Sequence, residues 1–152
     1  MPNYPSRLDI LYEISQTRNS GWLGSHLITY DDVDTLKSWK RNLYDRQWSE
    51  LNVAQKYERL LALLLMLNLR SDSDQMDLGI KLSGPAHYDP AGKVIWLGNK
   101  PSIITALHEL GHYFFGSSEL KACVYSVAMF SEAFPKEYAS LKWDGHMMKR
   151  LT

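Results

Sequence analysis

Residues 101–116 read Pro-Ser-Ile-Ile-Thr-Ala-Leu-His-Glu-Leu-Gly-His-Tyr-Phe-Phe-Gly, and this is the most informative stretch of the chain. Its apolar side chains recur at helical spacing and lie within about 60° of one another around a helix axis. They are Ile103, Leu107, Leu110 and Phe114. Pro101 and Ser102 can begin a helix, and Gly116 can end it in the left-handed conformation. The sequence therefore predicts a helix over 102–115 with one buried apolar face.

A separate polar face of the same helix carries His108, Glu109 and His112. The two histidines are one turn apart and about 40° apart around the axis, so both imidazoles can bind one zinc ion at about 2 Å. Glu109 follows His108 directly, where its carboxylate can contact a metal-bound water rather than the metal. Because the polar and apolar patterns use different positions, the stretch predicts an amphipathic helix that carries a zinc site.

A catalytic zinc needs a third protein ligand and an open position for water, and the residues after the helix supply candidates. Glu119 follows the second histidine by seven residues and comes within reach only if the chain reverses at 116–118. Glu132 is a second candidate, twenty residues after that histidine, and Asp144 and His146 are further alternatives. We expect Glu119 to be the third ligand, with Glu132 as the main alternative.

The segment before this helix changes to a strand-like composition. Residues 79–82 and 93–97 are rich in β-branched and aromatic side chains. Between them lie Gly84-Pro85 and Asp89-Pro90-Ala91-Gly92, which are typical of turns. We expect a small antiparallel sheet or hairpin here, with 94–97 as its best-defined strand.

Helical patterns account for most of the remaining chain. Helices are expected from about residue 8 to Gly21, from 31 to 48, from 53 to 69, from 119 to 134 and from 136 to 142, with a loop at 70–77 and helix again in the last residues. No Pro/Gly linker divides the chain, so 1–152 is expected to form a single domain with a helical part at 1–70. Helices, a small sheet and helices again indicate a mainly helical α+β fold.

Composition excludes several classes of partner. The 152 residues include 17 Lys+Arg and 17 Asp+Glu, so the chain lacks the basic excess typical of nucleic-acid or anionic-membrane binding. The most apolar stretch, 60–69, is far shorter than the roughly 20 residues needed to span a bilayer. With the single Cys123 no internal disulfide is formed, and residues 1–10 resemble no signal peptide. We expect a cytoplasmic protein that binds neither nucleic acid nor membrane.

His108-Glu109-Leu110-Gly111-His112 resembles the motif of gluzincin-type zinc metallopeptidases, in which two histidines and a later glutamate bind the metal. Residues 119–126, followed by Pro135, are similar to the Glu-x-x-Ala-x-x-Phe-Ala…Pro segment of the ImmA/IrrE-type and minigluzincin proteins. The resemblance covers about 79–135. It implies a zincin-like fold in which Glu119 is the third ligand.

The same resemblance implies that strand 94–97 is an edge strand that aligns an extended substrate. The chain departs from the family in having a shorter segment between the second histidine and the glutamate. Tyr125-Ser126 replaces Phe-Ala, no helix-turn-helix is identified, and residues 1–70 match nothing recognised.

These residues predict a zinc-dependent metallopeptidase with one zinc ion per chain and a peptide or protein substrate. Glu109 would act as the general base on a zinc-activated water. No oxyanion-stabilising residue is identified: Tyr113, Tyr125, Tyr138 and His146 are candidates, each of which is also explained by other roles such as core packing.

Two alternatives to a peptidase remain. One is a zinc-binding fold that binds proteins without cleaving them, and the other is a metal-free helical module that uses its aromatic residues as a binding surface. Cys123 is expected to be a small buried hydrophobic residue rather than a nucleophile. The oligomeric state is left open.

Overall fold

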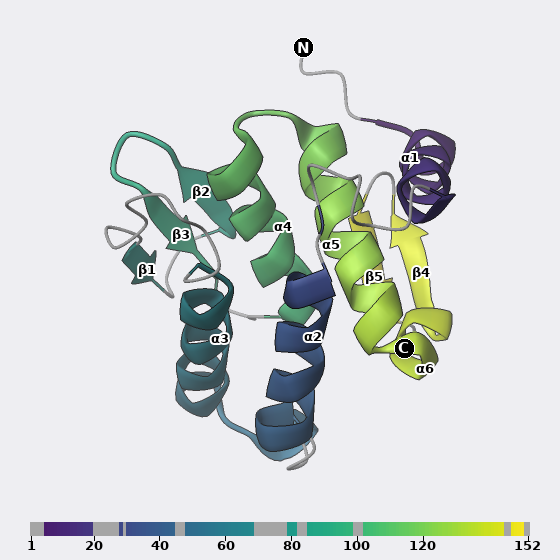
Figure 1. The fold of residues 1–152 in the computed structure, drawn as a ribbon. Helices are drawn as coiled ribbons and strands as arrows, with labels where there is room; N and C mark the ends of the chain where they lie inside the picture. Colours follow the sequence, from purple (N-terminus) through teal and green to yellow (C-terminus); the bar gives the residue numbers. More distant parts are fainter. Residues whose placement is uncertain are drawn as a thin grey trace.

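The fold is mainly helical, with two small sheets (Figure 1). The computed structural model describes residues 5–19, 28, 30–44, 48–68, 79–81, 85–98, 102–144 and 147–150. The helices are α1 (Arg7–Asn19), α2 (Tyr30–Trp39), α3 (Val53–Asn68), α4 (Ile103–Phe115), α5 (Glu119–Ala133) and α6 (Pro135–Ala139), with a π-helical turn at Lys40–Tyr44 and a 3-10 turn at Trp48–Glu50. The strands are β1 (Gly79–Lys81), β2 (His87–Asp89), β3 (Val94–Trp96), β4 (Leu141–Asp144) and β5 (Met147–Arg150). An α+β fold is confirmed.

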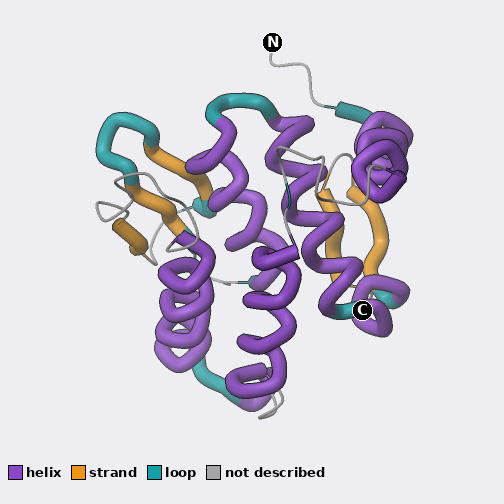
Figure 2. Tube along the Cα trace, viewed as in Figure 1, coloured by secondary structure: helices purple, strands orange, loops and turns teal. Residues whose placement is uncertain are grey.

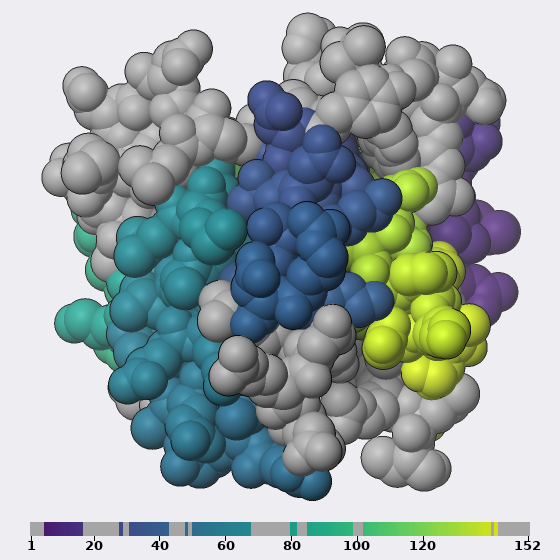
Figure 3. Space-filling view, turned by 60° about the horizontal axis from the view of Figure 1, so that its bottom comes forward, coloured from purple at the N-terminus to yellow at the C-terminus, as the bar shows by residue number. Residues whose placement is uncertain are grey.

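Helices α4 and α5 pack against each other at the centre of the molecule. Helix α3 and the sheet β1–β3–β2 contact α4, whereas α1, α2 and α6 contact α5. The tube in Figure 2 shows the same arrangement, and Figure 3 shows α2 at the surface between α3 and the end of α5. The core is formed by side chains from all these elements, among them Trp39, Leu60, Ile95, Leu107 and Tyr125, each fully buried. No helix in the described part of the chain combines the length and apolarity needed to cross a membrane.

The sequence predicted α3, α4 and α5 to within one residue at each end. It predicted α2 wrongly, because that helix ends at Trp39 rather than near 48. The chain turns there and returns the ring of Trp48 to the ring of Trp39, edge-on at 5.9 Å. Helix α2 therefore stops at Trp39, and Trp39 packs against the returning Trp48. The predicted helix end at Gly21 and the predicted loop at 70–77 lie outside the described residues.

The three-stranded sheet is mixed rather than antiparallel. Strand β3 is central: β1 pairs with it in parallel and β2 pairs with it in antiparallel register. The turn chemistry at 90–93 joins β2 directly to β3, and the amide of Ala91 donates to the side chain of Asp89 at 3.1 Å. The hairpin partner of β3 is therefore β2. The strand predicted at 79–82 is β1, which pairs with the other edge of β3.

The helix predicted at 136–142 is present but shorter, as α6, and the prediction of helix in the last residues was wrong for 147–150. Helix α6 ends at Ala139, and the hydroxyl of Ser140 donates to the carbonyl of Glu137 at 2.8 Å. Strands β4 and β5 then form an antiparallel hairpin in which Asp144 faces Met147. The strands are only four residues long, so pairing with each other supplies the backbone hydrogen bonds that neither segment obtains alone.

A three-residue link turns the chain from α4 into α5. The N–H of Gly116 donates to the carbonyl of His112 at 2.9 Å, and Gly116 has a φ of 83°, a conformation that favours glycine. The hydroxyl of Ser118 then accepts from the N–H of Lys121 at 3.2 Å and caps α5. This reversal brings Glu119, the first residue of α5, back beside α4.

The far end of α5 is fixed by a single lysine. Nζ of Lys40 donates to the carbonyl of Ala133 at 3.0 Å and lies 4.8 Å from the ring centroid of Phe134. The same ammonium is 4.0 Å from Oε2 of Glu137. A cation is stabilising at a helix C-terminus, so α5 is held at this end as well as at its N-terminal cap.

Gly111 allows α4 and α5 to approach closely. A Cβ atom added at Gly111 would lie 2.9 Å from Cα and 3.3 Å from Cβ of Ala122. The nearest atom belongs to the backbone of α5, so a side chain at this position requires the two helices to move apart. The spacing between the helices therefore depends on glycine at 111.

We expect Gly111→Ala to destabilise the protein. Overpacking at a backbone contact costs about 1–3 kcal/mol, more than the gain of up to about 1 kcal/mol from better helix propensity. Chemical denaturation measures the free energy of unfolding. Gly116→Ala is the comparison, because no atom lies within 4 Å of its added Cβ and the cost there is only that of a positive φ. A Gly111→Ala variant as stable as wild type would contradict the proposed contact.

Candidate metal centre

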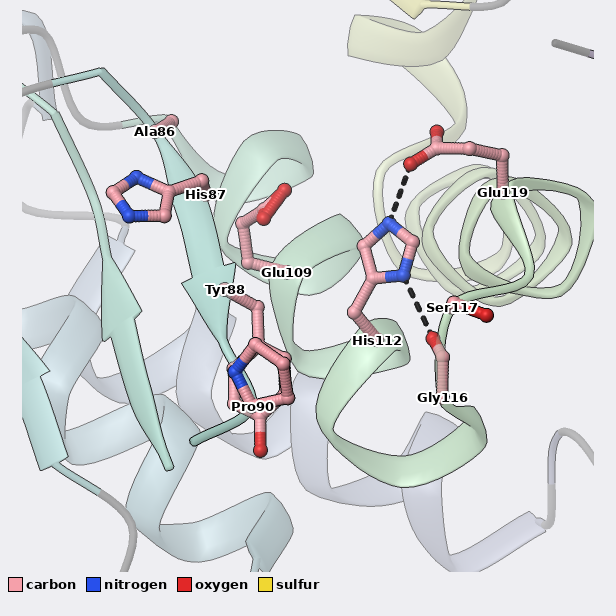
Figure 4. Close-up of a pocket in the computed structure, with 9 residues that line it drawn as sticks. All are labelled: Ala86, His87, Tyr88, Pro90, Glu109, His112, Gly116, Ser117 and Glu119. Atoms are coloured by element: carbon pink, nitrogen blue, oxygen red, sulfur yellow. Dashed lines mark hydrogen bonds and ion pairs between the residues drawn. The ribbon is translucent and has the colours of Figure 1, made fainter. Parts of the chain in front are cut away.

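Helices α4 and α5 bring two histidines and one glutamate together. Nε2 of His108 lies 3.2 Å from Oε2 of Glu119, and Nε2 of His112 lies 2.6 Å from Oε1 of the same carboxylate. The two imidazole centroids are 4.9 Å apart. Figure 4 shows His112 on α4 reaching across to Glu119 at the start of α5. Both Nε2 atoms thus face one point between the two helices.

The second nitrogen of His112 is fixed by the link between the helices. Its Nδ1 lies 2.8 Å from the carbonyl oxygen of Gly116, an acceptor, so Nδ1 carries a proton and donates (Figure 4). Nε2 also faces an acceptor, the Glu119 carboxylate, and donates to it only as an imidazolium. A metal cation at Nε2 would replace that proton and leave the Gly116 hydrogen bond intact.

Two of the three ligand–ligand distances are close to those around a small tetrahedral cation. Ligand atoms about 2.0–2.1 Å from a tetrahedral zinc lie about 3.3 Å apart. The His108–Glu119 distance of 3.2 Å meets this directly. The His112–Glu119 contact, at 2.6 Å a hydrogen-bond length, would widen by about 0.7 Å, within the freedom of a glutamate side chain. Imidazole nitrogen and carboxylate oxygen are also ligand types that zinc accepts.

The His108–Glu119 and His112–Glu119 contacts lower the pKa of Glu119 to about 2. The hydrogen bond with His108 is the largest cause and burial opposes it. The carboxylate is therefore ionised and is ready to bind a cation or a protonated imidazole.

Glu109 is buried beside the histidines, and a carboxylate oxygen of Glu109 and one nitrogen of each ring lie within 4.8 Å of one another. Its side chain is 6% exposed, and Oε2 has no hydrogen-bond partner within the described part of the chain. Burial raises the pKa of this carboxyl, while the nearby His108 and His112 oppose the rise. In Figure 4 the carboxylate lies between β2 and His112. An unpartnered buried oxygen at this place is a group ready to accept a proton.

A pocket of about 440 Å³ opens beside Glu109, His112 and Glu119. Its described lining comes from β2 and its flanks, from α4 and from the start of α5: Ala86, His87, Tyr88, Pro90, Glu109, His112, Gly116, Ser117 and Glu119 (Figure 4). The sequence did not single out His87 or Tyr88. The only signal was their position between two turn motifs, which indicates a short strand. The pocket lies between the edge of the sheet and the two site helices.

The structure places Glu132, the main alternative ligand, away from the cluster. Glu132 lies thirteen residues after Glu119 on α5, about 20 Å further along the axis. His146 and the side chain of Asp144 lie outside the described part of the chain. Only Glu119, of the candidates that are described, lies beside both histidines.

The three tyrosines among the predicted oxyanion candidates lie in packing positions, and His146 lies outside the described residues. The ring of Tyr125 is fully buried and packs against Phe114, at 5.9 Å, and Phe115. Tyr113 packs edge-on against Tyr88 at 5.7 Å, and Tyr138 on α6 packs against the core. Among the described residues that line the pocket, none is one of these three predicted tyrosines.

The expected edge strand was wrong. Strand β3, which contains 94–96, is central in its sheet, and β2 is the edge strand that borders the pocket. Cys123 is buried as expected, 1% exposed, and burial raises the pKa of its thiol to about 12. A thiol that stays protonated is a poor nucleophile.

Comparisons with known proteins found no relative of this chain. No family model matches it, and no curated protein or solved structure matches it. The protein is therefore described by its fold and its site. It has an α+β fold in which α4 supplies two histidines and α5 supplies a carboxylate that lies beside both.

We expect the metal-free protein to lose stability in acid through Glu119. Folding lowers the pKa of this carboxyl from 4.5 to about 2, so its contribution is fully present above about pH 4.5 and is lost as the pH falls toward 2. Denaturation with a chelator present, compared between wild type and Glu119→Gln, should show a stability difference that shrinks over this range. Glu132→Gln, on the same helix but far from the histidines, is the control. A difference that is constant between pH 4.5 and 2 would contradict the ion pairs.

Proposed function

We propose that this protein is a zinc-dependent metallopeptidase. One zinc ion per chain would be held by His108, His112 and Glu119, with Glu109 as the general base. The observation that carries the proposal is the convergence of two Nε2 atoms on one carboxylate, 3.2 and 2.6 Å away, beside a buried and unpartnered glutamate. A purely structural zinc site uses four protein ligands, whereas three ligands leave a position for water.

The residues divide the catalytic work between them. A bound zinc would supply Lewis-acid chemistry, polarising a peptide carbonyl and lowering the pKa of water to about 7. Glu109 would accept the proton of the attacking water and deliver it to the leaving nitrogen. Its burial supports this role, because a carboxyl with a raised pKa holds the proton between the two steps. The Gly116 carbonyl would keep His112 in the tautomer that presents Nε2.

The substrate class follows from the shape of the site. Strand β2 has a neighbour on one side only among the described strands, and its other edge is available to an extended peptide. The pocket between β2 and α4 would receive the peptide with its carbonyl near Glu109. The balance of 17 basic and 17 acidic residues also favours a peptide over a polyanion.

The resemblance to the gluzincin-type and ImmA/IrrE-type proteins belongs to this proposal, as does a zincin-like fold. It is supported by the order of parts: a small sheet, a helix with His108 and His112, and a second helix that begins at Glu119. A cytoplasmic location is proposed on the single cysteine, which leaves no internal disulfide to maintain.

About one zinc ion should co-purify per chain, and either His108→Ala or His112→Ala should abolish it. Glu119→Ala should lower zinc affinity by more than about 100-fold, because losing a ligand costs more than losing a hydrogen bond behind one. Glu132→Ala is the matched control and should bind zinc as wild type does. Metal analysis after gel filtration and competition with a chelator give both quantities. Full zinc content in a variant with both histidines replaced by alanine would contradict the proposed site.

Glu109→Gln separates catalysis from metal binding. The amide keeps the shape of the side chain but cannot accept the proton, so peptide cleavage should fall by about 10²–10⁴ with zinc content unchanged. The rate is measured on a peptide library with and without chelator. If the variant cleaves as fast as wild type, the mechanism is wrong. If wild type binds zinc but cleaves nothing, a non-catalytic zinc-binding fold replaces the peptidase.

A further inference from the structure

Helix α5 contacts both ring nitrogens of one histidine. Oε2 of Glu119 is 3.2 Å from Nε2 of His108, and Sγ of Cys123 is 3.8 Å from Nδ1 of the same ring. Glu119 and Cys123 are four residues apart, so they lie on one face of α5. The imidazole is 4% exposed and the thiol 1% exposed, so α5 holds this ring away from solvent.

A histidine that binds a metal through Nε2 has its proton on Nδ1. That proton is normally donated to an acceptor, which fixes the tautomer and the direction of the ring. His112 donates to the carbonyl of Gly116 at 2.8 Å. His108 instead has a sulfur atom at its Nδ1, so the two proposed ligands are supported by different kinds of acceptor.

We propose that Cys123 is a positioning residue whose thiol sulfur accepts a hydrogen bond from Nδ1–H of His108 and directs Nε2 toward the metal. The proposal rests on the proposed zinc site. Sγ lies on the Nδ1 side of the ring, whereas Nε2 faces Glu119. Ligand atoms of His108, Glu119 and Cys123 also lie within 4.8 Å of one another, so the experiment must distinguish a thiol that supports the ligand from one that binds the metal.

The expected size of the effect follows from the acceptor. Removing a hydrogen-bond partner behind a ligand typically costs about 10–100-fold in metal affinity. Neutral sulfur is a weak acceptor, so the loss on Cys123→Ala should be near the lower end of this range, about 10-fold.

The experiment measures zinc affinity by competition with a chelator in three variants of the full chain. Cys123→Ala removes the acceptor, Cys123→Ser retains one, and Val127→Ala is the control. Val127 is buried one turn further along α5 and has no polar side-chain atom, so its truncation loosens the same helix without removing a hydrogen-bond acceptor. Circular dichroism checks that each variant folds. If Cys123→Ala does not fold, the zinc affinity of Cys123→Ser is compared with that of wild type instead.

The proposal is supported if Cys123→Ala binds zinc about 10-fold more weakly while Cys123→Ser and Val127→Ala stay close to wild type. It is overturned if Cys123→Ala binds as wild type does, if Val127→Ala loses as much, or if Cys123→Ser fails to restore affinity. Cobalt in place of zinc gives a second test: a sulfur-to-cobalt charge-transfer band would make Cys123 a ligand and overturn the positioning role. A wild type that binds no zinc overturns the proposed function itself, whereas equal affinity in all variants removes only this inference.

Discussion

The close contact between α4 and α5 at Gly111 and Ala122 determines the geometry of the site. Helix α4 carries both histidines, and α5 carries the carboxylate that faces them, so the distance between the helices decides whether the groups meet. The Glu119 side chain is short. It reaches Nε2 of both histidines because Gly111, the residue before His112, places no side chain between the two helices. The glycine between the histidines is therefore part of the site, although it contributes no ligand.

The site also places polar groups where the fold would otherwise be apolar. His108 and Glu109 are buried on α4, next to Leu107 and Leu110 on its apolar face. Burying an unpartnered carboxyl oxygen costs roughly 1–3 kcal/mol. The continuous core offsets this, and the fixed ends of α5 hold the helix in place. A polar group kept in such a position at a cost in stability is typical of a functional site.

The sequence predicted what depends on local pattern. The bounds of α4 follow from Ser102, Gly116 and the spacing of its apolar residues, and the approach of Glu119 follows from a reversal at 116–118. It did not predict what depends on contacts between distant segments. The end of α2 depends on the return of Trp48, and the pairing of β1 with β3 across the sheet leaves no trace in either strand. Strand β2 has only three residues, too few for an alternating pattern to be recognised.

The doubly held imidazole of His112 has a consequence for how the protein would acquire a metal. Its Nδ1 hydrogen bond to Gly116 stays the same whether Nε2 holds a proton or a cation. Oε1 of Glu119 lies 2.6 Å from this Nε2, so the carboxylate is already beside the atom that would bind a cation. Binding of a cation at Nε2 would move the Glu119 oxygen away from this nitrogen by less than about 1 Å. His112 and Glu119 would then be in place before the ion, so the rate of loading would be set by how fast the ion arrives rather than by a rearrangement of these two side chains.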